Sequence, residues 1–302
     1  MDILSGTYSR MDQDMAGTFQ VLYGSEEGFK VAEELNGTDG EPLIIPATEE
    51  NMLRKICTRP FACDMDNDGD LDLVVGNFEG TFYMFEGEGD GEFNPEPTQM
   101  MDADGDALAV GHHSDPFMFD WDSDGDLDII SGSSSGGVSM AVNNGTAEEA
   151  DFSAFEEIIK AGEQRGWAEV VIGSEHITGP QGSTRVWVDD VNDDGKFDLI
   201  VGDSVTISTL GEGVEEDEVD ALLAEWEKEQ AEVTGGYQEF MEEYQEFAMA
   251  TPEEKEEMSD EEREEMEAKL SEYQEAMSAV YEKRSQIIDD QMTGYVWVYH
   301  QK

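Results

Sequence analysis

The chain has 302 residues and a formal net charge of −58, because 74 acidic residues stand against only 16 lysines and arginines. Such a surface repels phosphate backbones and anionic headgroups, which excludes nucleic acid and anionic membranes as charge-driven partners. No apolar run reaches the roughly 18 residues of a membrane span, so we expect no membrane insertion.

The N-terminal residues 2–6, DILSG, repeat the pattern of residues 72–76, DLVVG. Two further pairs follow in the same order, 16–29 with 79–93 and 38–45 with 103–110. The chain is therefore expected to start inside a repeat unit, so that either an upstream portion is missing or the array closes in a way the sequence does not reveal. The pairing also makes the sequence DADGD at 102–106 a tight Asp-Gly turn rather than a further metal site.

Three acidic segments share one spacing, at 64–76, 120–132 and 190–202. Oxygen ligands at positions 1, 3, 5 and 9, with glycine at position 6 for a sharp turn, are typical of a short loop around a hard cation such as calcium. Position 7 is lysine in the third segment, and an ammonium cannot bind a cation, so we expect this position to offer its backbone carbonyl in all three. The predicted ligands are Asp64, Asp66, Asp68, Asp70 and Asp72; Asp120, Asp122, Asp124, Asp126 and Asp128; and Asp190, Asn192, Asp194, Lys196 and Asp198.

An EF-hand begins with the same spacing but requires glutamate at position 12 and helices on both sides. Position 12 here is Val75, Ser131 and Val201. The residues after each loop, LDLVVG, LDIISG and FDLIVG, are short apolar runs that indicate strands buried on both faces. The loops are therefore predicted to join strands.

A strand pattern precedes each loop (RPFACD, DPFMFD, TRVWVDD), and another follows after a polar turn, at 80–87, 137–144 and 294–301. This order of strand, acidic loop, strand, turn and strand resembles the FG-GAP or VCBS repeat family, found in integrin alpha-chain propellers and bacterial secreted or surface proteins. The resemblance implies an all-β, FG-GAP-type β-propeller of about four blade units, binding about three calcium ions. It also implies an extracellular, periplasmic or cell-surface location, although no signal peptide is visible.

A Glu-rich segment at about 212–290 interrupts the last unit. Its apolar residues follow helical spacing from Val219 to Val233, from Tyr237 to Phe247 and, after a capping pattern at Ser259, from Met266 to Tyr281. We expect these stripes to pack on one another as a helical hairpin; a partner-binding role is the less favoured alternative. The expected domains are blades over 1–211, the acidic insertion over 212–290 and a final propeller strand over 291–302.

His112 and His113 in GHHSDP, and His176 in SEHITGP, both lie just before a predicted first strand. Such crossovers between blades approach a propeller's axis, where three imidazoles could bind a transition metal or a ligand. The favoured alternative is that each histidine only hydrogen-bonds nearby backbone. Cys57 and Cys63 could form a disulfide, but a place in an inner strand favours two buried thiols.

Three functions remain open. The first is a calcium-binding, non-catalytic module for extracellular adhesion or recognition of a protein or carbohydrate ligand. The second is a secreted enzyme, acting on polysaccharide for example, with a site on the His-lined face. A structural spacer is the third, and the ligand itself cannot be read from the fold.

Overall fold

The computed structural model describes residues 2–8, 17–47, 55–162, 170–249 and 260–301. The chain divides into two compact units. The first holds Met1–Gln164, Ile177–Val205 and Gly294–Lys302, and the second holds Arg165–His176 and Thr206–Thr293. Each unit has its own apolar core, so each is described by itself.

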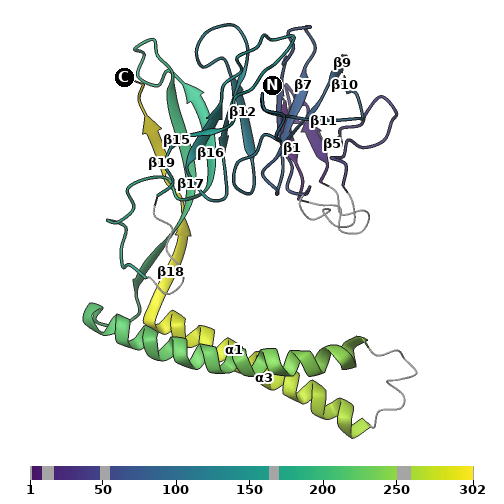
Figure 1. Ribbon diagram of the computed structural model, residues 1–302. Helices are drawn as coiled ribbons and strands as arrows, with labels where there is room; N and C mark the ends of the chain where they lie inside the picture. The colour runs from purple at the N-terminus through teal and green to yellow at the C-terminus, as the bar shows by residue number, and fades with distance from the viewer. Residues whose placement is uncertain (1, 9–16, 48–54, 163–169, 250–259, 302) are drawn as a thin grey trace. The chain divides into compact units, whose positions relative to one another are not determined.

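The first unit consists of antiparallel sheets, as predicted (Figure 1). We call the four main sheets blades 1 to 4, in chain order. Blade 1 contains β1 (Ile3–Gly6), β2 (Phe19–Leu22) and β5 (Glu33–Glu34); blade 2 contains β6 (Arg59–Cys63), β7 (Asp72–Gly76), β8 (Phe82–Phe85) and β11 (Thr98–Gln99); blade 3 contains β12 (Asp115–Phe119), β13 (Asp128–Gly132), β14 (Val138–Ala141) and β15 (Glu156–Ile159); blade 4 contains β16 (Gly182–Asp189), the first part of β17 (Asp198–Leu210) and β19 (Val296–Tyr299). Beyond Val205, β17 belongs to the second unit, and its sheet also includes β18 (Ile288–Thr293).

Two small additional hairpins are present beside the four main sheets. They are β3 (Gly24–Ser25) with β4 (Gly28–Phe29), and β9 (Gly87–Gly89) with β10 (Glu92–Phe93). The described strands form open sheets and no closed barrel. The fold class predicted from the loops, namely blade-like β-sheets with a helical insertion, is confirmed.

The strands that follow the acidic loops lie at the centre of the blades. All five residues of β7 and of β13 are buried, which explains why their sequences are continuously apolar rather than alternating. Side chains from opposite faces of these strands enter different clusters: Val74 packs between blades 2 and 3, whereas Leu73 and Val75 pack between blades 1 and 2. A third cluster joins blades 3 and 4.

A repeated contact, which we call the hydroxyl lock, joins each blade to the next. The glycine that ends β1, β7 or β13 approaches the backbone of the following blade so closely that an added Cβ would lie 2.0–2.2 Å from a carbonyl oxygen. That carbonyl belongs to a fully buried Thr or Ser, whose hydroxyl also donates to the earlier blade. The pairs are Gly6 with Thr58, Gly76 with Ser114, and Gly132 with Thr184.

Blade 4 has the same glycine but no such neighbour. A Cβ built on Gly202 meets nothing within 4 Å. Val296, the strand partner of Gly202, is 72% exposed, whereas the equivalent residues Phe82 and Val138 are 0% and 1% exposed. Within the described residues, the outward face of blade 4 is therefore uncovered.

The outermost strands β5, β11 and β15 were not predicted. β5 and β11 have only two residues each, and β15 begins with two exposed glutamates. Short, polar edge strands carry no hydrophobic alternation that a sequence pattern could detect.

The predicted turn at 102–106 is confirmed. The Asp102 N–H donates to the Asp106 carbonyl at 2.8 Å, and the flanking Met101 and Ala107 form an antiparallel bridge. The counterpart turn is closed by the Gly37 N–H and the Glu41 carbonyl at 2.9 Å.

The second unit contains the predicted helical hairpin, α1 (Val219–Met249) and α3 (Asp260–Ile287), preceded by a 3-10 turn at Glu216–Glu218 and followed by β18 (Ile288–Thr293). The two helices lie side by side (Figure 1). The Trp226 Nε1–H donates to the Val280 carbonyl at 2.7 Å inside their apolar contact, and Phe240 stacks on Tyr273. The first two predicted apolar stripes form one continuous helix, while Ser259 and the side chain of Phe247 lie outside the described residues.

No helix among the described residues is long and apolar enough to cross a membrane.

Candidate metal centres

The three acidic loops have one backbone conformation. Position 4 has a positive φ in each, at Asn67 (62°), Ser123 (64°) and Asp193 (59°). Position 6 also has a positive φ, at Gly69 (100°), Gly125 (105°) and Gly195 (82°), where glycine avoids the strain of a Cβ. The repeated sequence spacing therefore corresponds to a repeated shape.

Aspartates in each acidic loop accept hydrogen bonds from the backbone of the same loop. The position 1 aspartates, Asp64, Asp120 and Asp190, each accept the N–H of the glycine at position 6, at 3.2, 3.2 and 2.8 Å. The position 5 aspartates accept the N–H of position 7 at 2.8–3.2 Å, in pairs Asp68 with Asp70, Asp124 with Asp126, and Asp194 with Lys196. These bonds curl each loop back on itself.

The position 9 aspartates are buried and tie each loop to its blade. Both oxygens of Asp72 accept backbone N–H groups, from Met65 at 2.9 Å and from Gly87, just beyond β8, at 2.8 Å. Asp128 makes the same two bonds, to Trp121 and Asn143, and Asp198 accepts from Gln301. Asp2 accepts from Gly24 at 2.7 Å, which supports its alignment with position 9.

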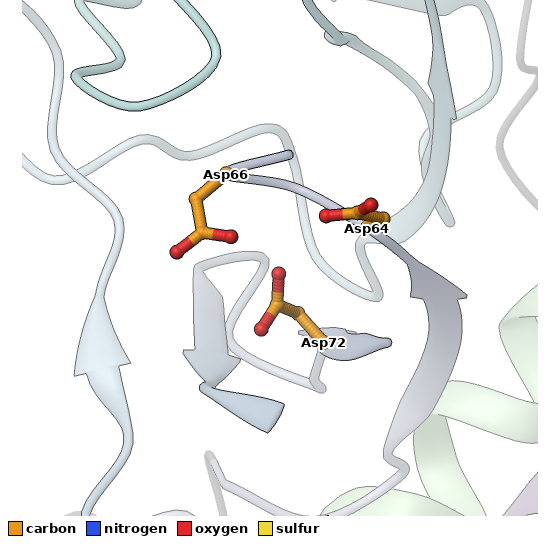
Figure 2. Close-up of side chains that lie close together, drawn as sticks. All are labelled: Asp64, Asp66 and Asp72. Atoms are coloured by element: carbon orange, nitrogen blue, oxygen red, sulfur yellow. The ribbon is translucent and has the colours of Figure 1, made fainter. Parts of the chain in front are cut away.

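Carboxylate oxygens converge in the first two loops. One oxygen from each of Asp64, Asp66 and Asp72 lies within 4.8 Å of the others, and Figure 2 shows these side chains around a common space. Asp120, Asp122 and Asp124 form an equivalent group. Carboxylates this close repel one another unless protons or a cation neutralise them.

Two buried oxygens in these loops lack hydrogen-bond partners. They are Oδ1 of Asp64 and Oδ1 of Asp126. A buried carboxylate oxygen without a donor is costly, and at position 1 a hard cation with oxygen ligands would satisfy Oδ1 of Asp64. Asp126 is at position 7, and its orphan oxygen is not part of the converging group. The donor set, made of carboxylate oxygens on a tight loop, therefore fits Ca²⁺ in its chemistry.

The third loop differs from the others. Its positions 3 and 7 are Asn192 and Lys196, so it holds less negative charge. His300 Nδ1 lies 2.9 Å from Oδ2 of Asp198 and 3.1 Å from Nδ2 of Asn192. The local sequence does not reveal the role of His300, because the contact depends on β19 pairing with β17.

Crowding of acids shifts their proton affinities. Burial, and then the carboxylate of Asp124, raises the pKa of Asp126 to about 6. Burial also raises the pKa of Asp72 and of Asp128, although backbone hydrogen bonds oppose it. Since the folded-state pKa lies above the unfolded one, protonation stabilises the metal-free fold at low pH, and this stabilisation is lost as the pH rises through the folded-state value.

We therefore expect the melting temperature in chelator to fall as the pH rises from about 4 to about 7. Asp126→Asn should remove part of this fall, because the amide cannot ionise. Burial lowers the pKa of His113, which acts in the opposite direction, so the difference between wild type and variant is the informative quantity. Differential scanning calorimetry in chelator would measure it; identical pH profiles for the two proteins would contradict the assignment.

The histidines of the predicted ligand face lie apart from the acidic loops. His112 and His113 lie before β12, at the end opposite to its acidic loop, and His113 has a positive φ of 60° with its ring centroid 4.5 Å from that of Phe78. His176 belongs to the second unit. Cys57 and Cys63 are both free thiols, the first buried and the second half-buried.

Comparison with known protein families gives a match to one part of the chain. Residues 64–112, from the first acidic loop to the crossover after β11, match the model of the FG-GAP-like repeat. No curated protein matches the chain. The segment from the first acidic loop through β11 is thus similar to an FG-GAP-like repeat; blade 3 has the strand order of blade 2, and all three acidic loops share their positive-φ positions.

Proposed function

We propose that the protein is an extracellular, calcium-stabilised β-propeller-like module that recognises a ligand and is not itself catalytic. The FG-GAP-like repeat and the blade architecture support the module. Calcium binding is supported chiefly by one observation: carboxylate oxygens converge within 4.8 Å in two loops, and in the first of them Oδ1 of Asp64 is buried without a hydrogen-bond partner.

The proposed ligands are the oxygens at positions 1, 3, 5 and 9 of each loop, with the position 7 carbonyl. Position 9 has a second role, because its two hydrogen bonds join the loop to the end of the third strand. An ion held there would bridge a loop to the centre of its blade. In this proposal calcium makes the blades rigid enough to present a recognition surface.

The direct test is a count of bound ions. Asp68→Ala and Asp124→Ala each remove one predicted side-chain ligand, so each variant should bind about one calcium ion fewer than the wild type. Asp70→Ala is the matched control, because it leaves the position 7 carbonyl in place and should retain the wild-type count. Equilibrium dialysis with elemental analysis would give the stoichiometry.

Two outcomes would contradict the proposal. Equal losses in Asp68→Ala and Asp70→Ala would mean that the side chain at position 7 binds the metal. Zinc, iron or copper in protein purified without chelator, with no calcium bound, would favour a metal-dependent enzyme instead.

A further inference from the structure

A cationic cluster lies at equivalent positions of three consecutive blades. Arg59, Asp115 and Arg185 are the strand partners of Gly76, Gly132 and Gly202 respectively, so each lies at the same place on the first strand of its blade. Each follows the Thr or Ser of the hydroxyl lock position, Thr58, Ser114 or Thr184. The first strands β6 and β16 both contact β12, which brings the three side chains together.

The three side chains form the Arg59–Asp115–Arg185 cluster. Oδ2 of Asp115 lies 3.2 Å from Nε of Arg185, and Oδ1 lies 3.8 Å from Nε of Arg59. The longer distance is beyond a hydrogen bond, and Nε of Arg59 is buried without a hydrogen-bond partner. One carboxylate therefore serves two guanidinium groups and satisfies only one of them well.

The surroundings add positive rather than negative charge. Burial, and then the charges of Arg59 and Arg185, lower the pKa of the His113 imidazole. Burial raises the pKa of Asp115, and the same two arginines oppose this rise. Among the described residues, this cluster therefore sets one carboxylate against two guanidinium groups, in a chain with 74 acidic residues.

The cluster is also accessible. The side chains of Arg59 and Arg185 are 36% and 39% exposed, whereas that of Asp115 is 21% exposed. A guanidinium can also present its two Nη groups as a planar pair of donors, which matches the two oxygens of a carboxylate. Nη1 of Arg185 already donates to the Thr184 carbonyl at 2.7 Å. Nε of Arg59 is buried, so an incoming carboxylate would meet the solvent-exposed part of the Arg59 side chain.

We propose that the Arg59–Asp115–Arg185 cluster binds the carboxylate group of an acidic ligand, such as a uronic acid sugar, with Arg59 as the main contact and His113 beside it. The proposal adds a ligand class to the proposed recognition function, and it rests on that function for its biological role. The net charge of the chain opposes anions at long range, but at physiological salt the screening length is about 8 Å, so the local cations dominate at the cluster.

Titration of glucuronate, monitored by isothermal calorimetry or NMR at about 0.15 M salt, tests the proposal. Glucuronate should bind saturably, and glucose, which lacks the carboxylate, should not. Arg59→Gln should weaken glucuronate binding about tenfold, which is the contribution of one charge-assisted hydrogen-bond pair. Lys269→Gln, on the exposed surface of α3, is the matched control and should bind as the wild type does.

A second variant separates binding from a purely structural role. Asp115→Ala removes the internal carboxylate, so an external one should bind about tenfold more tightly, and acetate should raise the variant's melting temperature. If the arginines only brace Asp115, this variant is destabilised and acetate does not restore it.

Three results would overturn the proposal: no saturable binding of glucuronate, equal binding of glucose, or an unchanged affinity in Arg59→Gln. The rise in melting temperature caused by calcium, measured on the Arg59→Gln protein, is the independent readout. If calcium still raises the melting temperature while the wild type does not bind glucuronate, the proposed carboxylate site is wrong and the proposed calcium-binding module is unaffected.

Discussion

Calcium should raise the melting temperature of this protein by about 15 °C or more between chelator and saturation. Each site filled at about 100 times its dissociation constant adds about 2.7 kcal/mol, so three sites add about 8 kcal/mol. A domain of this size gains about 2–4 °C per kcal/mol. The rise should begin at about 0.1–1 mM free calcium, the range of dissociation constants of extracellular modules, and should continue as the calcium concentration increases further. Thermal melts at fixed ionic strength would measure it.

Magnesium at the same concentration is the necessary control, because any divalent cation screens a chain with a net charge of −58. Magnesium prefers a rigid octahedral shell and keeps several waters, so it should give a clearly smaller shift. Asp64→Ala should also reduce the calcium shift, through loss of the first site. A melting temperature that is unchanged by chelator would remove the basis for all three sites.

The second large effect is expected at the hydroxyl locks. Gly132→Ala places a methyl group 2.2 Å from the carbonyl oxygen of Thr184, so blades 3 and 4 must separate or the Thr184 hydroxyl must lose its bond to the Gly137 carbonyl. Overpacking together with a lost buried hydrogen bond should cost about 3 kcal/mol. Urea unfolding in saturating calcium, followed by near-ultraviolet circular dichroism, would measure the loss.

Gly202→Ala is the matched control for this prediction. The residue occupies the equivalent position on β17, but a Cβ there meets nothing within 4 Å. The variant should change stability by less than about 0.5 kcal/mol. Equal costs at Gly132 and Gly202 would show that the penalty arises from the strand itself rather than from the contact between blades.

The loops and central strands could be predicted from sequence because local chemistry determines both. Ligand spacing, the glycine at position 6 and a continuous apolar run all lie within thirteen residues, as in 64–76. The same applies to the helical insertion, whose apolar stripes are long and periodic. Each of these signals depends on neighbours in the chain, and the structure confirms the elements they predict.

Contacts between blades could not be predicted in this way. The lock between Gly76 and Ser114 joins residues 37–38 positions apart, and nothing in the local sequence distinguishes that glycine from one that ends a strand for other reasons. The Arg59–Asp115–Arg185 cluster was missed for the same cause, since its members belong to three different blades. His300 near Asp198 required knowledge of strand pairing 102 residues away.

The bonds of the position 9 aspartates also bear on the order of folding. Asp72 binds partners only 7 and 15 residues away, whereas the locks at Ser114 and Thr184 span 37 and 51 residues. Closing a short loop costs less chain entropy than closing a long one, so a loop and its own strand pair assemble before the blades join. Because each blade contacts mainly its neighbours, each repeat can begin to fold separately. The free calcium concentration then determines how stable each partly folded repeat is.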